Sequence, residues 1–307
     1  MCCLFGILDY GHKLSRKEKT KILSVLSVAC EERGTDATGI AYNSGGSLKV
    51  YKRPLPAHLL WFKVNEDTNH VMGHARMSTQ GSERFNANNH PFAGKAGDTT
   101  FALAHNGVLS NDKRLRRQHD LPTTKIETDS YIAVQLLEAS GELSFASLAS
   151  MAEKLEGSFT ISVMTDQDDL YLIKGENPIC LYHYEKLNFY IYASTEPILK
   201  TALKQLNMKL GKPTKIKLGC GEILKIDAAG NMSRGQFDDS KIFLGYSHWP
   251  RYYSRPAVWE TVQDSQASYI EDLKSVAAYY GIWPEDIDEM LADGVTPEEI
   301  EELLNGA

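Results

Sequence analysis

The chain has 307 residues, 42% of them hydrophobic, which is enough to bury a sizeable core within one large domain. Its formal net charge of −7 comes from 33 basic and 40 acidic residues. This balance argues against a nucleic-acid binder with a general basic face, although not against a local basic patch. Five cysteines without CxxC spacing indicate neither a disulfide framework nor a zinc site, so a reducing cytoplasm is expected. No apolar run reaches the ~20 residues that span a bilayer, and nothing resembles a signal peptide.

Most of the chain alternates between helical and strand patterns. Apolar residues at helical spacing predict an amphipathic helix from residue 16 to near Gly34, and further helices over 128–140, 142–157 and 196–206. Alternating patterns predict paired strands over 38–53 around a Gly-Gly turn, and over 158–175, 179–194 and 221–237. Residues 101–111 are predicted to be a strand that runs into a turn. Hairpins interrupted by helix pairs favour an α+β fold of antiparallel sheets with helices outside.

The C-terminal part differs in character from the main domain, which we place at residues 2–240. Residues 241–263 are rich in Tyr, Trp, Arg and Pro without any period, which predicts an irregular connector. Residues 264–307 predict a small acidic module of three short helices.

Two helix boundaries in the acidic module carry specific signals. Pro284 is predicted to occupy the first helical position, and Gly294 to end the same helix. Thr296 and Glu299 have the spacing of a capping box at the start of the next helix. The apolar stripe of the module suits either a partner protein or the surface of its own chain.

A cysteine directly behind the initiator methionine is unusual, because it can become the first residue. Removal of Met1 is expected when the next side chain is small, as that of Cys2 is. The α-amino group then titrates near ~8 and the thiol near ~8.5 on the same residue. The amine can therefore take the thiol proton, directly or through one water. The alternative is that Cys2 and Cys3 are small buried residues of a first strand.

Six short motifs follow Cys2 in order along the chain. They are ERGTDATGIA (32–41), GHARMSTQG (73–81), NNHPF (88–92), AHNGVLSN (104–111), ETDSY (127–131) and LEGSFTISV (155–163). Together with Cys2 they resemble the glutaminase domain of class II glutamine amidotransferases, which are N-terminal-nucleophile hydrolases. The resemblance covers roughly residues 2–235 and implies a four-layer αββα sandwich. It also implies hydrolysis of the glutamine side-chain amide to glutamate and ammonia, with no metal or organic cofactor.

The resemblance assigns the catalytic chemistry to three residues. Cys2 is the nucleophile, while the side-chain amide of Asn106 and the backbone N–H of Gly107 donate to the oxyanion. A glycine at 107 lets the backbone approach closely. An Asn-Gly pair is also typical of a hairpin turn, and such a turn would aim the two donors.

The resemblance also implies a clamp for a free amino acid. Arg76 suits the α-carboxylate of glutamine, because a guanidinium can donate two parallel charge-assisted hydrogen bonds. Thr79 adds a hydroxyl to the same carboxylate, and Asp129 pairs with the α-ammonium group. His90 corresponds to a histidine that lies near the glutamine site in relatives, and we assign it to positioning rather than to proton transfer.

Several neighbouring residues are predicted to be structural. His74 is interpreted as a histidine that braces its strand, and Arg33 and Asp36 as scaffold beneath the site, with Arg33 bracing the N-terminal strand. A metal site built from His74, His90 and His105 lacks ligand spacing.

Three residues depart from the family pattern. Cys3 stands where a glycine usually follows the nucleophile, and its Cβ is expected to crowd the site or to supply a second thiol. Met77 replaces an aromatic residue found in many members, and Gln80 replaces a histidine found in some. These departures are compatible with glutamine hydrolysis but weaken assignment to a particular synthase.

No synthase domain fits into the residues after about Phe237. The ammonia is therefore expected to reach an acceptor site on another protein, or to be released. Residues 264–307 are either a docking module for such a synthase or a helical lid on the same chain. Two rival functions remain open, a non-enzymatic scaffold that binds glutamine or a partner, and an amidase of the same fold that acts on N-acyl compounds.

Overall fold

The computed structural model describes residues 2–242 and, beyond them, residues 270, 273–274, 277, 282, 284–297, 299–300 and 303. The chain divides into two compact units, residues 1–249 and 250–307. The predicted connector lies almost wholly outside the described residues, and the domain boundaries given above stay a prediction. None of the described helices is long and apolar enough to cross a membrane.

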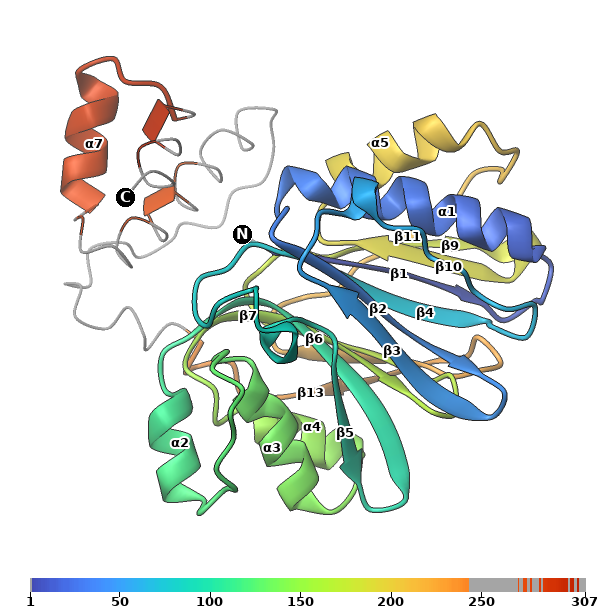
Figure 1. The fold of residues 1–307 in the computed structure, drawn as a ribbon, viewed down its shortest axis with the longest axis horizontal. Coiled ribbons are helices and arrows are strands. Elements are labelled where there is room, and N and C mark those ends of the chain that lie inside the picture. The colour runs from blue at the N-terminus through green and yellow to red at the C-terminus, as the bar shows by residue number, and fades with distance from the viewer. Residues whose placement is uncertain are drawn as a thin grey trace. The chain divides into compact units, whose positions relative to one another are not determined.

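Two antiparallel sheets make up the first unit (Figure 1). The first sheet, in the order β11-β9-β10-β1-β4-β2-β3, contains β1 (Cys3–Asp9), β2 (Ala37–Ser44), β3 (Ser47–Arg53), β4 (His70–Arg76), β9 (Cys180–Tyr184), β10 (Phe189–Ala193) and β11 (Thr214–Ile216). The second sheet, in the order β13-β12-β8-β7-β6-β5, contains β5 (Phe92–Ala96), β6 (Thr99–Leu109), β7 (Gly157–Thr165), β8 (Leu170–Lys174), β12 (Glu222–Ile226) and β13 (Met232–Gln236).

Helices cover the outer face of each sheet (Figure 1). The first sheet is covered by α1 (Arg16–Ala29) and α5 (Glu196–Leu206), and the second by α3 (Tyr131–Ser140) and α4 (Phe145–Ala152). The short helix α2 (Asp112–Gln118) follows β6. Single 3₁₀ turns are η1 (Cys30–Glu32), η2 (Ala57–Leu59), η3 (Asn86–Asn88) and η4 (Glu185–Leu187). The predicted four-layer αββα sandwich is confirmed.

Strand β1 shows how the layers are built. Phe5 and Ile7 lie in the apolar cluster beneath α1 and α5, whereas Leu4 and Leu8 lie in the cluster between the two sheets. Successive side chains of a strand point to opposite faces, so a strand buried on both faces contributes to two cores. The fully buried residues of the middle core, which joins the two sheets, therefore all come from strands.

The helices and hairpins predicted within residues 16–237 are present, including the Gly-Gly turn between β2 and β3, where Gly45 and Gly46 both have positive φ. The predicted turn at Asn106 and Gly107 is wrong, because β6 runs straight through both residues and pairs with β7. Strand β4 was not predicted as an element, since all its residues are buried and its sequence does not alternate.

A buried ion pair fastens α1 to the first sheet. Lys19 Nζ lies 3.4 Å from Asp9 Oδ2, and both side chains are almost completely buried. Lys19 also donates to the carbonyl of Thr68 at 2.8 Å, while the Asp9 carboxylate accepts from the backbone N–H groups of Lys13 and Leu14. Each charge is thus desolvated but fully hydrogen-bonded, which is the condition under which a buried pair is tolerated.

The second unit is described in part. Helix α7 (Pro284–Ala292) begins at the predicted proline, and Gly294 follows it with a φ of 89°. The predicted capping box is confirmed, because Glu299 N–H donates to Thr296 Oγ1 at 3.3 Å and Thr296 N–H donates to Glu299 at 2.8 Å. A small apolar cluster contains Leu273, Ala277, Ile287 and Ile300. Most of the first helix predicted for this module lies outside the described residues.

Replacing Lys19 with Met should lower the free energy of unfolding by about 3–5 kcal/mol, because Asp9 would remain buried without its counter-charge. Urea unfolding measures this change. Lys17→Met, on an exposed position of the same helix, is the control and should cost less than about 0.5 kcal/mol. Equal losses of unfolding free energy in the two variants would contradict a stabilising role of the buried Lys19–Asp9 ion pair.

Candidate active site

Cys2 stands directly before β1, at the end of the middle core. The register of β1 and β4 pairs Leu4 with His74, and continuing it by two residues brings Cys2 opposite Arg76. Because alternate residues share a face, Cys2 faces the second sheet together with Leu4. The cysteine is therefore directed into the space between the two sheets.

Backbone contacts hold the cysteine in this position. Its carbonyl accepts a hydrogen bond from Arg33 Nε at 3.1 Å, so the predicted bracing of the N-terminal strand by Arg33 is confirmed. Its Sγ lies 3.4 Å from the carbonyl oxygen of Met77, to which the thiol donates. Burial raises the pKa of the Cys2 thiol, against the opposing charges of the amino terminus and Arg76. The thiol thus stays protonated at neutral pH unless a base acts on it.

Asn106 and Gly107 lie within β6, on the sheet that Cys2 faces. Gly107 has a φ of 142°, and a Cβ there would lie 2.0 Å from the carbonyl oxygen of Ser158, so glycine is required. Asn106 is held by its carbonyl, which accepts from Asn177 Nδ2 at 3.0 Å. Its own Nδ2 is buried and has no hydrogen-bond partner among the described residues. A buried N–H donor is thus left for a ligand.

A hydrogen bond across the two sheets links the cysteine end of β1 to this strand. His74, which pairs with Leu4, donates from Nε2 to the carbonyl of His105 at 2.9 Å. His105 directly precedes Asn106. The start of β1 and the Asn106 segment of β6 are therefore held at the same end of the sandwich.

The guanidinium of Arg76 is buried and oriented by the protein. It donates to Asn89 Oδ1 at 2.6 Å and to the carbonyls of Gln80 and Gly81, each at 2.7 Å. Three of its five N–H groups are thereby used, which leaves two for a ligand. Both N–H groups of Nη2 are among those used, so the remaining two lie on Nε and Nη1 and point in different directions. Each can donate to a ligand singly, not as the parallel pair expected from the sequence.

Asp129 lies just before α3 and is also buried. Its Oδ2 accepts from the Leu109 N–H at 2.6 Å, and its Oδ1 accepts from Ser130 at 2.8 Å. Burial is the main influence on the pKa of the Cys2 thiol, but Arg76 lowers it and Asp129 raises it. Both charges therefore act on the sulfur, as expected of groups arranged around one site.

The chain is similar to known glutamine amidotransferases. Residues 74–201 match the model of the glutamine amidotransferase domain family. An amidophosphoribosyltransferase of Methanocaldococcus jannaschii is 29% identical over 240 residues, which cover 73% of this chain and 48% of that protein. A glutamine–fructose-6-phosphate aminotransferase of Halobacterium salinarum is 31% identical over 161 residues, which cover 50% of this chain and 26% of that protein.

The chain carries a class II glutamine amidotransferase domain. Solved structures show the same fold, namely the glutamine phosphoribosylpyrophosphate amidotransferase of B. subtilis (TM-score 0.60, 20% identity, covering 77% of this chain and 49% of that one). The allosteric regulatory enzyme of purine biosynthesis gives a TM-score of 0.62 at 19% identity, covering 90% of this chain and 58% of that one. The chain thus spans at most about half the length of the curated relatives named above.

Two buried histidines lie in ring contact beside the candidate site. The ring of His90 lies 4.2 Å from that of His74 and 4.4 Å from that of Phe92, between centroids. Burial lowers the pKa of His74 to about 3 and holds that of His90 well below its usual range, so both rings are neutral at neutral pH. Such rings fit positioning better than proton transfer. Throughout the described ranges, no group of three or more His, Cys, Asp or Glu is arranged to hold a metal ion.

The expectation that Cys3 crowds the candidate site or adds a second thiol is wrong. Cys3 is completely buried in the cluster beneath α1, with Phe5, Leu26 and Cys30. Strand alternation turns its side chain away from the face that Cys2 uses. The substitution of glycine by cysteine after the nucleophile is therefore accommodated by the outer core.

The segment after Arg76 contains the remaining predicted residues. Thr79 is half-buried there, and Gln80 Nε2 donates to the carbonyl of Glu127 at 2.9 Å. Asp36 accepts from the Ser78 N–H at 2.6 Å, as scaffold beneath the site. The segment is thus tied both to β2 and to the residues that precede Asp129.

Sequence reasoning missed the residues that orient the candidate site through hydrogen bonds. Asn89, which holds Arg76, and Ser130, which holds Asp129, lie inside quoted motifs and could have been found there. Asn177 and Lys52 lie outside every motif, and no sequence signal pointed to them.

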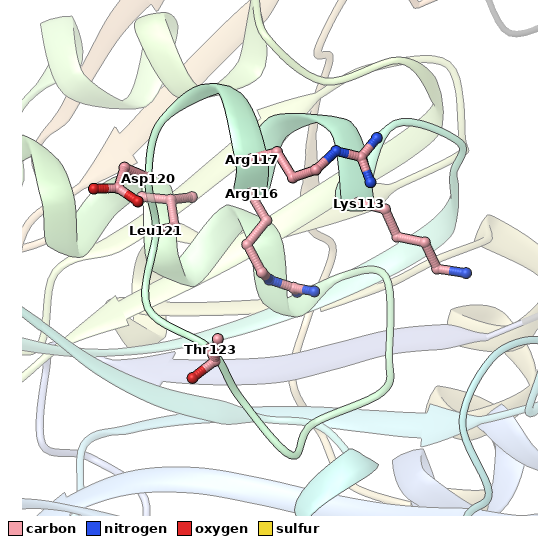
Figure 2. A pocket seen from close by; sticks show the side chains of 6 residues that line it. All are labelled: Lys113, Arg116, Arg117, Asp120, Leu121 and Thr123. Atoms are coloured by element: carbon pink, nitrogen blue, oxygen red, sulfur yellow. The ribbon is translucent and has the colours of Figure 1, made fainter.

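A separate basic hollow of about 350 Å³ lies beside α2 (Figure 2). It is lined by Lys113, Arg116, Arg117, Asp120, Leu121 and Thr123. Figure 2 shows the cationic ends of the three basic residues on one side of the helix and the Asp120 carboxylate on the other. None of the predicted site residues lines this hollow, which is a local basic patch on an acidic chain.

Gly107→Ala should cost at least about 3 kcal/mol of unfolding free energy, because it adds both backbone strain and a clash with Ser158. Thermal or urea unfolding measures the loss. Gly141→Ala is the matched control, since Gly141 also has positive φ, 74°, but a Cβ there would contact nothing within 4 Å. The control should cost about 1 kcal/mol. Similar costs at both positions would refute the close approach at Gly107.

Proposed function

We propose that this chain hydrolyses the side-chain amide of L-glutamine through a thioester on Cys2, giving glutamate and ammonia. The observation that carries the proposal is the buried Asn106 Nδ2, which has no partner in the part of the chain that the structure describes and belongs to the strand that Cys2 faces. Leaving such a donor unsatisfied costs about 1–3 kcal/mol, so the arrangement calls for a functional reason.

The first step needs a base, because burial raises the pKa of the Cys2 thiol. Removal of Met1 would leave an α-amino group on Cys2 itself, with an ordinary pKa of about 7.7–8.0. That amine takes the thiol proton, directly or through one water, as Sγ attacks Cδ of the substrate. Nucleophile and base then belong to one residue.

The attack creates an oxyanion, to which Asn106 Nδ2 and the Gly107 N–H donate. The ammonium of Cys2 returns its proton to the leaving nitrogen, the C–N bond breaks, and ammonia departs. A water molecule then adds to the thioester with the same amine as base. The C–S bond breaks, glutamate leaves, and the thiol is restored.

Recognition of free glutamine uses both of its α-groups. Arg76 donates to the α-carboxylate from an N–H group that the protein leaves unused, with Thr79 as a further donor, and Asp129 accepts from the α-ammonium. His90 supports the site as a neutral ring. An N-acyl amide lacks this pair of charges, which argues against the rival amidase.

We also propose that the ammonia serves an acceptor site on another protein in the cytoplasm. Residues 264–307 are strongly acidic, with Lys274 as their single basic residue, and the first turn of α7 carries Glu285 and Asp286. A synthase with a basic docking surface would complement this charge.

Cys2→Ala should reduce glutamate release by at least about 10³-fold, because the nucleophile is lost. A coupled glutamate assay measures it. Cys220→Ser is the matched control, since Cys220 is exposed and should leave the rate unchanged. Glutamate release that survives Cys2→Ala would overturn the mechanism, and wild-type protein that binds but never hydrolyses glutamine would favour the scaffold.

Asn106→Ala should lower kcat by about 10²–10³-fold, with KM for glutamine nearly unchanged, because the donor acts on the transition state. Steady-state kinetics separate the two constants. A change confined to KM would instead make Asn106 a ground-state binding residue.

A further inference from the structure

Lys52 ties β3 to the segment that follows the arginine clamp. Its Nζ donates a short hydrogen bond to the carbonyl of Asn89 and lies 4.8 Å from the ring centroid of Phe92. Its own carbonyl accepts from Asn86 Nδ2 at 2.9 Å. Gly39 faces the same place, and a Cβ on it would meet both the His90 carbonyl and Lys52 Cβ, at 2.3 and 2.7 Å. The segment is therefore packed closely against the sheet around Lys52.

The contact of Lys52 leads directly to Arg76. The backbone carbonyl of Asn89 accepts the hydrogen bond from Lys52. Its side-chain Oδ1 accepts a hydrogen bond from Arg76 Nη1 at 2.6 Å. Asn89 Nδ2 also donates to the Glu83 carbonyl at 2.8 Å. The position of the arginine thus depends on a residue that the lysine holds.

Lys52 changes its charge state at mildly alkaline pH. Burial and the nearby charge of Arg76 lower the pKa of Lys52 to about 8. The other titratable groups that face it, His74 and His90, are neutral rings whose pKa values burial and the neighbouring charges lower. No carboxylate offsets this effect within the described residues.

We propose that Lys52 is a positioning residue for the binding of glutamine. The ammonium group of Lys52 fixes Asn89 and thereby the guanidinium of Arg76. The inference rests on the proposed function. Below about pH 8 the hydrogen bond to Asn89 is charge-assisted, and above it the neutral amine donates more weakly. KM for glutamine should therefore rise as pH passes through that value, while kcat keeps its own profile.

The test compares wild type, Lys52→Arg and Lys52→Met by steady-state kinetics from about pH 6.5 to 9.5. Arginine stays charged throughout, so Lys52→Arg should lack the alkaline rise in KM that depends on Lys52. Lys52→Met should raise KM about 10-fold or more at the acidic end, with kcat within about twofold. Lys49→Met, an exposed lysine of the same strand, should behave as wild type.

The substrate amine titrates identically in every variant, so the difference between wild type and Lys52→Arg isolates the lysine. An alkaline rise of equal size in both, or an unchanged KM in Lys52→Met, would overturn this inference alone. Wild-type protein without any glutamine turnover would overturn the proposed function as well. If Lys52→Met does not fold, the profile of Lys52→Arg decides.

Discussion

Everything at the candidate site depends on how the backbone around Cys2 is held in place. In the proposed mechanism Cys2 is the first residue, with covalent structure on one side only, so non-covalent contacts must fix the other side. Here β1 lies in the middle of its sheet, between β10 and β4, and is buried on both faces. The Arg33 contact with the Cys2 carbonyl adds a clamp at the first residue. The fold thus gives a terminus the order of a core strand.

The layers of the sandwich assign separate tasks to neighbouring residues. Cys2 and Cys3 are adjacent in sequence but face opposite sides of the first sheet: Cys3 lies in the apolar cluster beneath α1, whereas Cys2, like Leu4, faces the space between the sheets. The same division places Asn106 towards the middle space while its strand stays paired with β7. Strand alternation therefore lets one residue contribute to the apolar core while its neighbour in sequence faces the candidate site.

Much of the fold could be predicted from the sequence, because hairpins and amphipathic helices leave periodic patterns. Strand β4 left none, since burial on both faces removes alternation. The Asn-Gly pair misled for a different reason. Its local preference is for a turn, but pairing with Thr160 and Phe159 overrides that preference, and the φ of Gly107 is used within a strand. Contacts such as Lys52 to Asn89 join residues far apart in the chain and leave no periodic trace.

The unsatisfied amide of Asn106 has a consequence for the resting protein. A buried donor without an acceptor makes the folded state less stable than an apolar side chain of similar size would. The folded domain is therefore somewhat less stable than it could be, and in return Asn106 Nδ2 is available to donate to a negatively charged oxygen of a ligand. A bound oxyanion mimic would supply the missing acceptor, so part of its affinity would come from removing this deficit, and its binding would stabilise the folded domain accordingly.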